Sequence, residues 1–150
     1  MVSLRALGGV LVVTILSAAP VAAQQAVPAG HVKIATGAAY IVRQNATIAA
    51  KPGDAVFPTD TLRTQANGTI GVTLADDTRV SLGPDSEMRL ERYVFAPADG
   101  ALGMVLNFVR GVAAYVSGRM AKLSPDSVRL ETPAAIVGVR GTTVAIRVGS

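Results

Sequence analysis

The stretch Thr69–Leu90, TIGVTLADDTRVSLGPDSEMRL, decides the fold class of this chain. Apolar residues alternate with polar or small ones in three short runs, as Ile70, Val72 and Leu74 do in the first. A period of two is typical of a β-strand with one buried face and one face in water. The runs are separated by ADD and GPDS, whose Asp, Gly and Pro residues favour tight turns. The stretch therefore predicts three short strands joined by tight connections.

The same alternation continues over most of the chain from His31 onward. It returns in Val32 and Ile34, in ALGMVLNFV at residues 101–109, and in the last apolar residues at 144–148. Only SGRMAKLSPDS, residues 117–127, is a candidate for a helical turn. We therefore predict an all-β domain, with its short strands in a twisted β-solenoid-like or sandwich stack. Periodicity alone does not distinguish these two architectures.

The first 23 residues have the features of a secretory signal peptide. Arg5 and the amino terminus supply positive charge, an apolar run spans Leu7–Leu16, and Val21–Ala23 offers the small residues of a cleavage site. The apolar run is about ten residues long, half of the roughly 20 that a membrane-spanning helix needs. We predict a cleaved signal peptide, a linker at residues 24–30 and an all-β domain at residues 31–150. The protein is then periplasmic or secreted.

The composition excludes several kinds of chemistry. The chain has no cysteine, so a disulfide, a thiol nucleophile and a thiolate metal site are all excluded. Its single histidine, His31, adjoins the linker and is interpreted as an exposed residue at the start of a strand. The carboxylates Asp76, Asp77 and Asp85 do not match the spacing of a calcium loop. We therefore predict no metal site, no cofactor and no catalytic residues, and interpret Asp76-Asp77 as part of a turn.

The charge pattern bears on the class of ligand. The formal net charge is +4, but the 14 Lys and Arg residues are scattered singly and aromatic residues make up 4%. This pattern disfavours nucleic-acid binding, which needs clustered cations and stacking rings. A small secreted enzyme acting on envelope glycans stays open as an alternative, since sequence spacing does not reveal a pair of carboxylates.

The C-terminal stretch LETPAAIVGVRGTTVAIRVGS, residues 130–150, contains an arginine between two apolar runs. Its candidate residues, for a structural motif or for partner binding, are Thr132, Pro133, Gly138, Arg140, Gly141 and Thr142. The two glycines allow sharp corners around Arg140, whose guanidinium carries five donors in a rigid fork. Arg140 could clamp the last corner by binding carbonyl groups or a carboxylate such as Glu131 or Asp54. Alternatively, Arg140 with Thr142 and Thr143 binds an anion or a partner's carboxylate.

Taken in order, the motifs resemble the FecR-type periplasmic domain over roughly residues 37–148. The resemblance rests on the Gly53-Asp54 turn, a strand ending in Thr64, LADDTRVSLGPDSEMRL, the Arg110-Gly111 step and the ending Thr132-Pro133 with Val139–Thr142. One departure is Asp77, where the family commonly has glycine in an Asp-Gly turn.

The resemblance implies an all-β, solenoid-like domain and a place in envelope signalling. Its best-known members regulate iron-siderophore uptake, sensing an outer-membrane transporter and controlling a sigma factor through a cytoplasmic segment. With a cleaved signal peptide in place of that segment, we expect this chain to lack direct anti-sigma activity. We predict a non-catalytic module that binds an unknown envelope protein or glycan. The sequence leaves its oligomeric state open.

Overall fold

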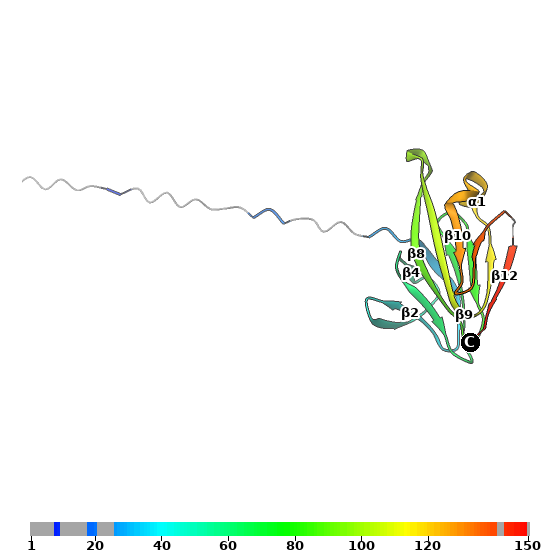
Figure 1. The fold of residues 1–150 in the computed structure, drawn as a ribbon. Coiled ribbons are helices and arrows are strands. Elements are labelled where there is room, and N and C mark those ends of the chain that lie inside the picture. The colour runs from blue at the N-terminus through cyan, green and yellow to red at the C-terminus, as the bar shows by residue number, and fades with distance from the viewer. Residues whose placement is uncertain (1–7, 10–17, 21–25, 141–142, 150) are drawn as a thin grey trace, which may run out of the picture.

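The computed structural model describes residues 8–9, 18–20, 26–140 and 143–149, and the folded domain begins near Ala29 (Figure 1). Ala29 is buried, and its N–H donates to the carbonyl of Val56. Most of the predicted signal peptide, residues 1–23, lies outside the described residues, which include only 8–9 and 18–20 of it. Among the residues that are described, no helix is long and apolar enough to cross a membrane.

The longest strand, β9 (Ala101–Val116), belongs to two sheets. Its first half pairs with β8 (Glu87–Ala96) and β10 (Val128–Glu131), whereas its second half pairs with β7 (Arg79–Leu82) and β12 (Thr143–Val148). The strand order β3-β2-β5-β8-β9-β7-β6-β1-β4 is therefore continuous, and the sheet curls over itself around β9.

Two sheets result from this sharing. The first sheet consists of β3 (Ala46–Ala49), β2 (Ala39–Arg43), β5 (Thr61–Thr64), β8, the first half of β9, β10 and β11 (Ile136–Gly138). The second sheet consists of β4 (Ala55–Val56), β1 (Gly30–Thr36), β6 (Thr69–Leu74), β7, the second half of β9 and β12. The remaining elements are short: η1 (Pro97–Asp99), α1 (Arg119–Leu123) and η2 (Pro125–Ser127).

The structure confirms the predicted all-β class. The one α-helix among the described residues, α1, lies within residues 117–127, the stretch identified as a candidate for a helical turn. In the described part of the chain, strand pairs are antiparallel except for β9 with β10. The sheet forms a curled half-barrel, in which β9 pairs with different strands along its two halves. The strand order across this curled sheet departs from the chain order, so successive segments are not stacked as the rungs of a regular solenoid would be.

The core lies between the two sheets and is built as the alternation predicted. The large apolar residues of Thr69–Leu90 all point inward and are at most 3% exposed: Ile70, Val72, Leu74, Val80, Leu82, Met88 and Leu90. They pack with the inward residues of β9, among which Tyr115 and Phe108 are the largest buried side chains. Alternate residues on the same strands reach solvent, so each strand contributes one face to the core.

Ile34 in β1 departs from the alternation because of an irregularity in strand pairing. Ile34 is 60% exposed, although Val32, two positions earlier, is buried. The pairing of β1 with β6 shifts between these residues, so that Val32 faces Val72 and Ile34 faces Gly71. Lys33 is the extra residue of this β-bulge, and an extra residue moves all later side chains to the opposite face. The bulge therefore places Ile34 on the outer face of the second sheet.

Candidate functional site

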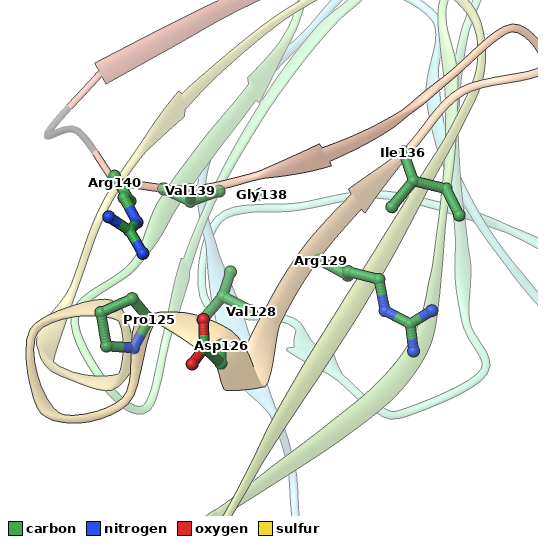
Figure 2. A pocket seen from close by; sticks show the side chains of 8 residues that line it. All are labelled: Pro125, Asp126, Val128, Arg129, Ile136, Gly138, Val139 and Arg140. Carbon is green, nitrogen blue, oxygen red and sulfur yellow. The ribbon is translucent and has the colours of Figure 1, made fainter.

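A cleft of about 330 Å³ opens beside β10 and β11, where the C-terminal motif is located (Figure 2). Val128 and Val139 are buried at its base. The exposed residues of its lining are Pro125, Asp126, Arg129, Ile136, Gly138 and Arg140. Figure 2 shows Asp126 and Val128 between the two arginines in this view. The cleft thus presents two cations, one carboxylate and an isoleucine that is 65% exposed.

The tight connection between β10 and β11 shapes this cleft. Thr132 and Ala135 are joined by N–H to carbonyl hydrogen bonds in both directions, at 2.9 and 3.4 Å. The Thr132 hydroxyl also accepts from the N–H of Ala135 at 3.1 Å. Pro133 is exposed within this turn, where its missing N–H leaves no ladder position empty. Thr132 and Pro133 therefore form the hairpin that pairs Arg129 with Gly138.

Among the described residues, Arg140 has no partner of the kind that the clamp interpretation suggested, and that interpretation stays a prediction. Within the described part of the chain, the exposed Arg140 side chain makes no hydrogen bond or ion pair. The two carboxylates considered as its partners bind elsewhere: Glu131 lies 3.8 Å from Arg129, and Asp54 accepts from the N–H of Lys51 at 2.9 Å.

Gly138 shows no feature that requires glycine. Gly138 continues β11 with no positive φ, and a Cβ built on it would meet nothing within 4 Å. Gly141 and Thr142, the other candidates, lie outside the described residues. The structure thus brings Gly138 and Arg140 together at the cleft and leaves Arg140 accessible. Its binding interpretation stays a prediction.

The acidic residues considered for a metal site have separate structural environments. Asp76 is fully buried, whereas Asp77 is exposed and lies 3.2 Å from Arg119. Asp85 is exposed in the turn between β7 and β8. Among the described residues, no group of three His, Cys, Asp or Glu side chains could hold a metal ion. His31 is exposed at the beginning of β1, in accordance with its interpretation as a strand-start residue.

The Asp76 carboxylate is the centre of a buried hydrogen-bond cluster. Its Oδ1 accepts from the Tyr93 hydroxyl at 2.9 Å and from the N–H of Thr78 at 3.3 Å. Its Oδ2 accepts from the Thr78 hydroxyl at 2.7 Å and from the N–H of Met120 at 3.1 Å. This Asp76 cluster joins the β6–β7 turn to β8 and α1. Burial, followed by the Asp76 charge, raises the pKa of the Tyr93 hydroxyl.

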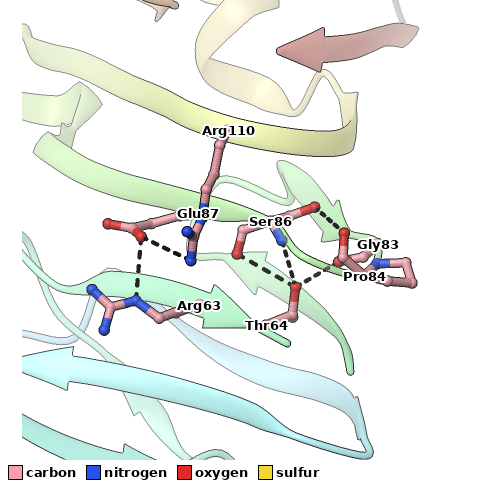
Figure 3. Close-up of polar contacts among 7 residues, drawn as sticks. All are labelled: Arg63, Thr64, Gly83, Pro84, Ser86, Glu87 and Arg110. Carbon is pink, nitrogen blue, oxygen red and sulfur yellow. Dashed lines mark hydrogen bonds and ion pairs between the residues drawn. The ribbon is translucent and has the colours of Figure 1, made fainter. Parts of the chain in front are cut away.

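The Arg110-Gly111 step marks a second polar cluster, which sequence reasoning identified only as a motif (Figure 3). Gly111 has a φ of +87°, and a Cβ there would lie within 2.6 Å of the Asp85 carbonyl and collide with Ser86. The Ser86 hydroxyl accepts from the N–H of Val112 at 2.9 Å, and the Ser86 N–H donates to the Thr64 hydroxyl at 3.0 Å. Gly111 is therefore required by backbone conformation and by close approach.

Comparison with known proteins adds one finding to this geometry. A family model described as FecR protein matches residues 60–150. Searches of curated proteins and of solved structures found no match. The matched range contains the Asp76 cluster, the Arg110-Gly111 step and the cleft with Arg140. The chain belongs to the FecR family.

Proposed function

We propose that this protein is a non-catalytic binding module of the bacterial envelope, and that the cleft at Arg140 binds an anionic group of an envelope protein or polymer. The observation that supports it most directly is the state of Arg140. This residue of the family motif is exposed at the cleft without a hydrogen bond or ion pair to any described residue. A guanidinium in that state is available for a carboxylate or phosphate, which it binds through two parallel hydrogen bonds.

The cleft has the mixed character of a macromolecular contact. Arg129 supplies a second cation, although the carboxylate of Glu131, 3.8 Å away, offsets part of the positive charge at the cleft. Ile136 supplies apolar surface beside the arginines. Interfaces commonly combine such an apolar anchor with a polar rim, and arginine is frequent among the residues that contribute most to affinity.

Family membership supports the non-catalytic and signalling parts of the proposal. FecR proteins are regulatory signalling proteins. A regulator acts through binding, so an accessible cation in a shallow cleft suits this role better than a buried acid and base would. The predicted signal peptide supports a location in the periplasm or outside the cell. Envelope signalling of the iron-siderophore type is then the setting in which such binding would operate.

The test is crosslinking and affinity capture from envelope extract with the purified exported protein. We expect wild type to enrich one or a few envelope proteins or an anionic polymer, and Arg140→Ala to lose them with an unchanged melting temperature. Arg89→Ala is the matched control, because Arg89 is an exposed arginine whose ion pair with Glu91 lies on β8. Equal recovery by wild type and by Arg140→Ala would refute the role of the cleft.

A further inference from the structure

The outer face of the second sheet carries a shallow groove formed by three adjoining hollows. The middle hollow, about 420 Å³, lies over β1, β6 and β7. It shares Lys33 and Thr73 with a hollow of about 360 Å³ at the β6–β7 turn. It shares Ser81 with a third hollow of about 370 Å³ that extends onto β9. The groove therefore runs across four strands, and it shares no lining residue with the cleft at Arg140.

The β-bulge in β1 shapes one wall of the middle hollow. It makes Lys33 an extra residue and places Ile34 opposite Gly71 on the outer face. Bulges of this kind often redirect side chains next to functional sites. Both Lys33 and Ile34 line the middle hollow. The β-bulge therefore places the cation of Lys33 and the exposed apolar side chain of Ile34 in the groove.

The charge of the groove is positive and uncompensated at its centre. Lys33 and Arg79 are exposed, and within the described part of the chain neither side chain makes an ion pair or a hydrogen bond. Because β6 lies between β1 and β7, their backbones are about 10 Å apart. The carboxylate in the lining, Asp77 at one end, lies 3.2 Å from Arg119. A ligand in the groove thus meets two cations that no carboxylate of the described chain neutralises.

The floor of the groove suits an extended polypeptide better than a sugar ring. Gly71, Ser81 and Ala114 are successive partners across β6, β7 and β9, so small residues cross the sheet in one row. No phenylalanine, tyrosine or tryptophan lines the three hollows, so sugar rings have no aromatic face on which to stack. The exposed isoleucine lies within a hollow rather than on a projecting loop, which disfavours insertion into a lipid surface.

We propose that this groove binds an acidic protein segment in an extended conformation. Its carboxylates would pair with Lys33 and Arg79, and an apolar side chain would contact Ile34. In an extended segment, alternate side chains lie about 7 Å apart on one face. The backbones that carry Lys33 and Arg79 are about 10 Å apart, and their long side chains are flexible enough for both cations to contact carboxylates at the shorter spacing. This second binding surface is independent of the cleft at Arg140.

The test measures binding of a fluorescent eight-residue peptide, in which Asp and Glu flank a central Leu, by fluorescence anisotropy. The full exported protein should bind it, and binding should weaken with added NaCl because exposed charges are screened. The double variant Lys33→Ala/Arg79→Ala should weaken binding by about tenfold or more, since both charge contacts are lost.

Gly71→Val fills the floor without removing a charge and should weaken binding similarly. Its Cβ would lie 3.7 Å from Ser81 Oγ, an ordinary contact, so folding should be retained and the melting temperature checks this. Lys51→Ala, which removes an exposed lysine outside the groove, should leave binding unchanged. If Lys51→Ala weakened peptide binding equally, the loss of binding would reflect the net charge of the protein rather than the groove, and this would overturn the proposal. Tighter binding of an oligogalacturonate or of phosphatidylglycerol vesicles than of the peptide would overturn it too.

Discussion

Replacing Asp76 by Asn tests whether the buried Asp76 cluster holds the domain together. The substitution keeps the shape of the side chain but replaces one carboxylate oxygen by an NH₂ group. In the wild type, each oxygen of the Asp76 carboxylate accepts two hydrogen bonds, and all four donors are buried. Whichever oxygen is replaced, two of the four hydrogen bonds are lost and a backbone N–H, that of Thr78 or of Met120, loses its acceptor.

The expected cost follows from this count. A hydrogen bond to a charged group contributes about 1.5–3 kcal/mol, and an unsatisfied buried donor costs about 1–3 kcal/mol. The hydroxyls of Thr78 and Tyr93 can rotate toward other acceptors, which recovers part of the loss. We therefore expect Asp76→Asn to lower the free energy of unfolding by about 2–4 kcal/mol.

The assay is urea denaturation followed by circular dichroism, with Asp77→Asn as the matched control. Asp77 is the next residue, carries the same charge and keeps 74% of its side chain exposed beside Arg119. Its substitution should change the free energy of unfolding by no more than about 0.5–1 kcal/mol, as expected for a surface ion pair. Equal costs for the two variants would refute the structural role assigned to Asp76.

Three further predictions concern the backbone and pH. Gly111→Ala should lower the free energy of unfolding by about 2–4 kcal/mol, because a Cβ at φ +87° meets the Asp85 carbonyl; the same denaturation assay tests this. Asp77→Gly should leave the free energy of unfolding unchanged or raise it by up to about 1 kcal/mol, whereas Asp77→Val should lower it, because residue 77 has a φ of +68°; equal stability of the two variants would contradict this. The raised pKa of Tyr93 predicts a stability that is complete below the unfolded value of about 10 and is lost as the pH rises through the folded value. Tyr93→Phe should therefore flatten the loss measured between pH 9 and about 11, and an unchanged slope would exclude Tyr93 as its source.

The fold class was predictable because alternation records burial directly. Ile70, Val72 and Leu74 point inward as the period of two requires. The exposed Ile34 was not predictable, because the bulge at Lys33 depends on how β1 pairs with β6, and pairing is not encoded in the pattern of one strand. For the same reason, the sequence does not predict that β9 belongs to both sheets, because its sixteen residues do not indicate where one sheet ends and the other begins.

The candidate site was predictable in part. The sequence identified Arg140 as unusual, and the structure places it at a cleft, exposed. Glu131 and Asp54, the two carboxylates suggested as clamp partners, both bind other groups, and the clamp interpretation itself stays a prediction. The sequence does not show which carboxylate lies near an arginine, because tertiary strand pairing sets this. The Asp76 cluster was missed for the same reason: Tyr93 and Met120 are distant from Asp76 in the sequence.

Among the described residues of the family motif, backbone conformation explains some positions, whereas it does not explain Arg140. Gly111 is required because its φ is positive and Ser86 packs against it. Residue 77, where the family commonly has glycine, also adopts a positive φ, and Asp tolerates that conformation at some cost. Arg140 has no comparable explanation, because it is exposed and no described residue bonds to its side chain. Our proposal that Arg140 binds a ligand accounts for this exposed motif residue, so Arg140→Ala is the most informative variant for function.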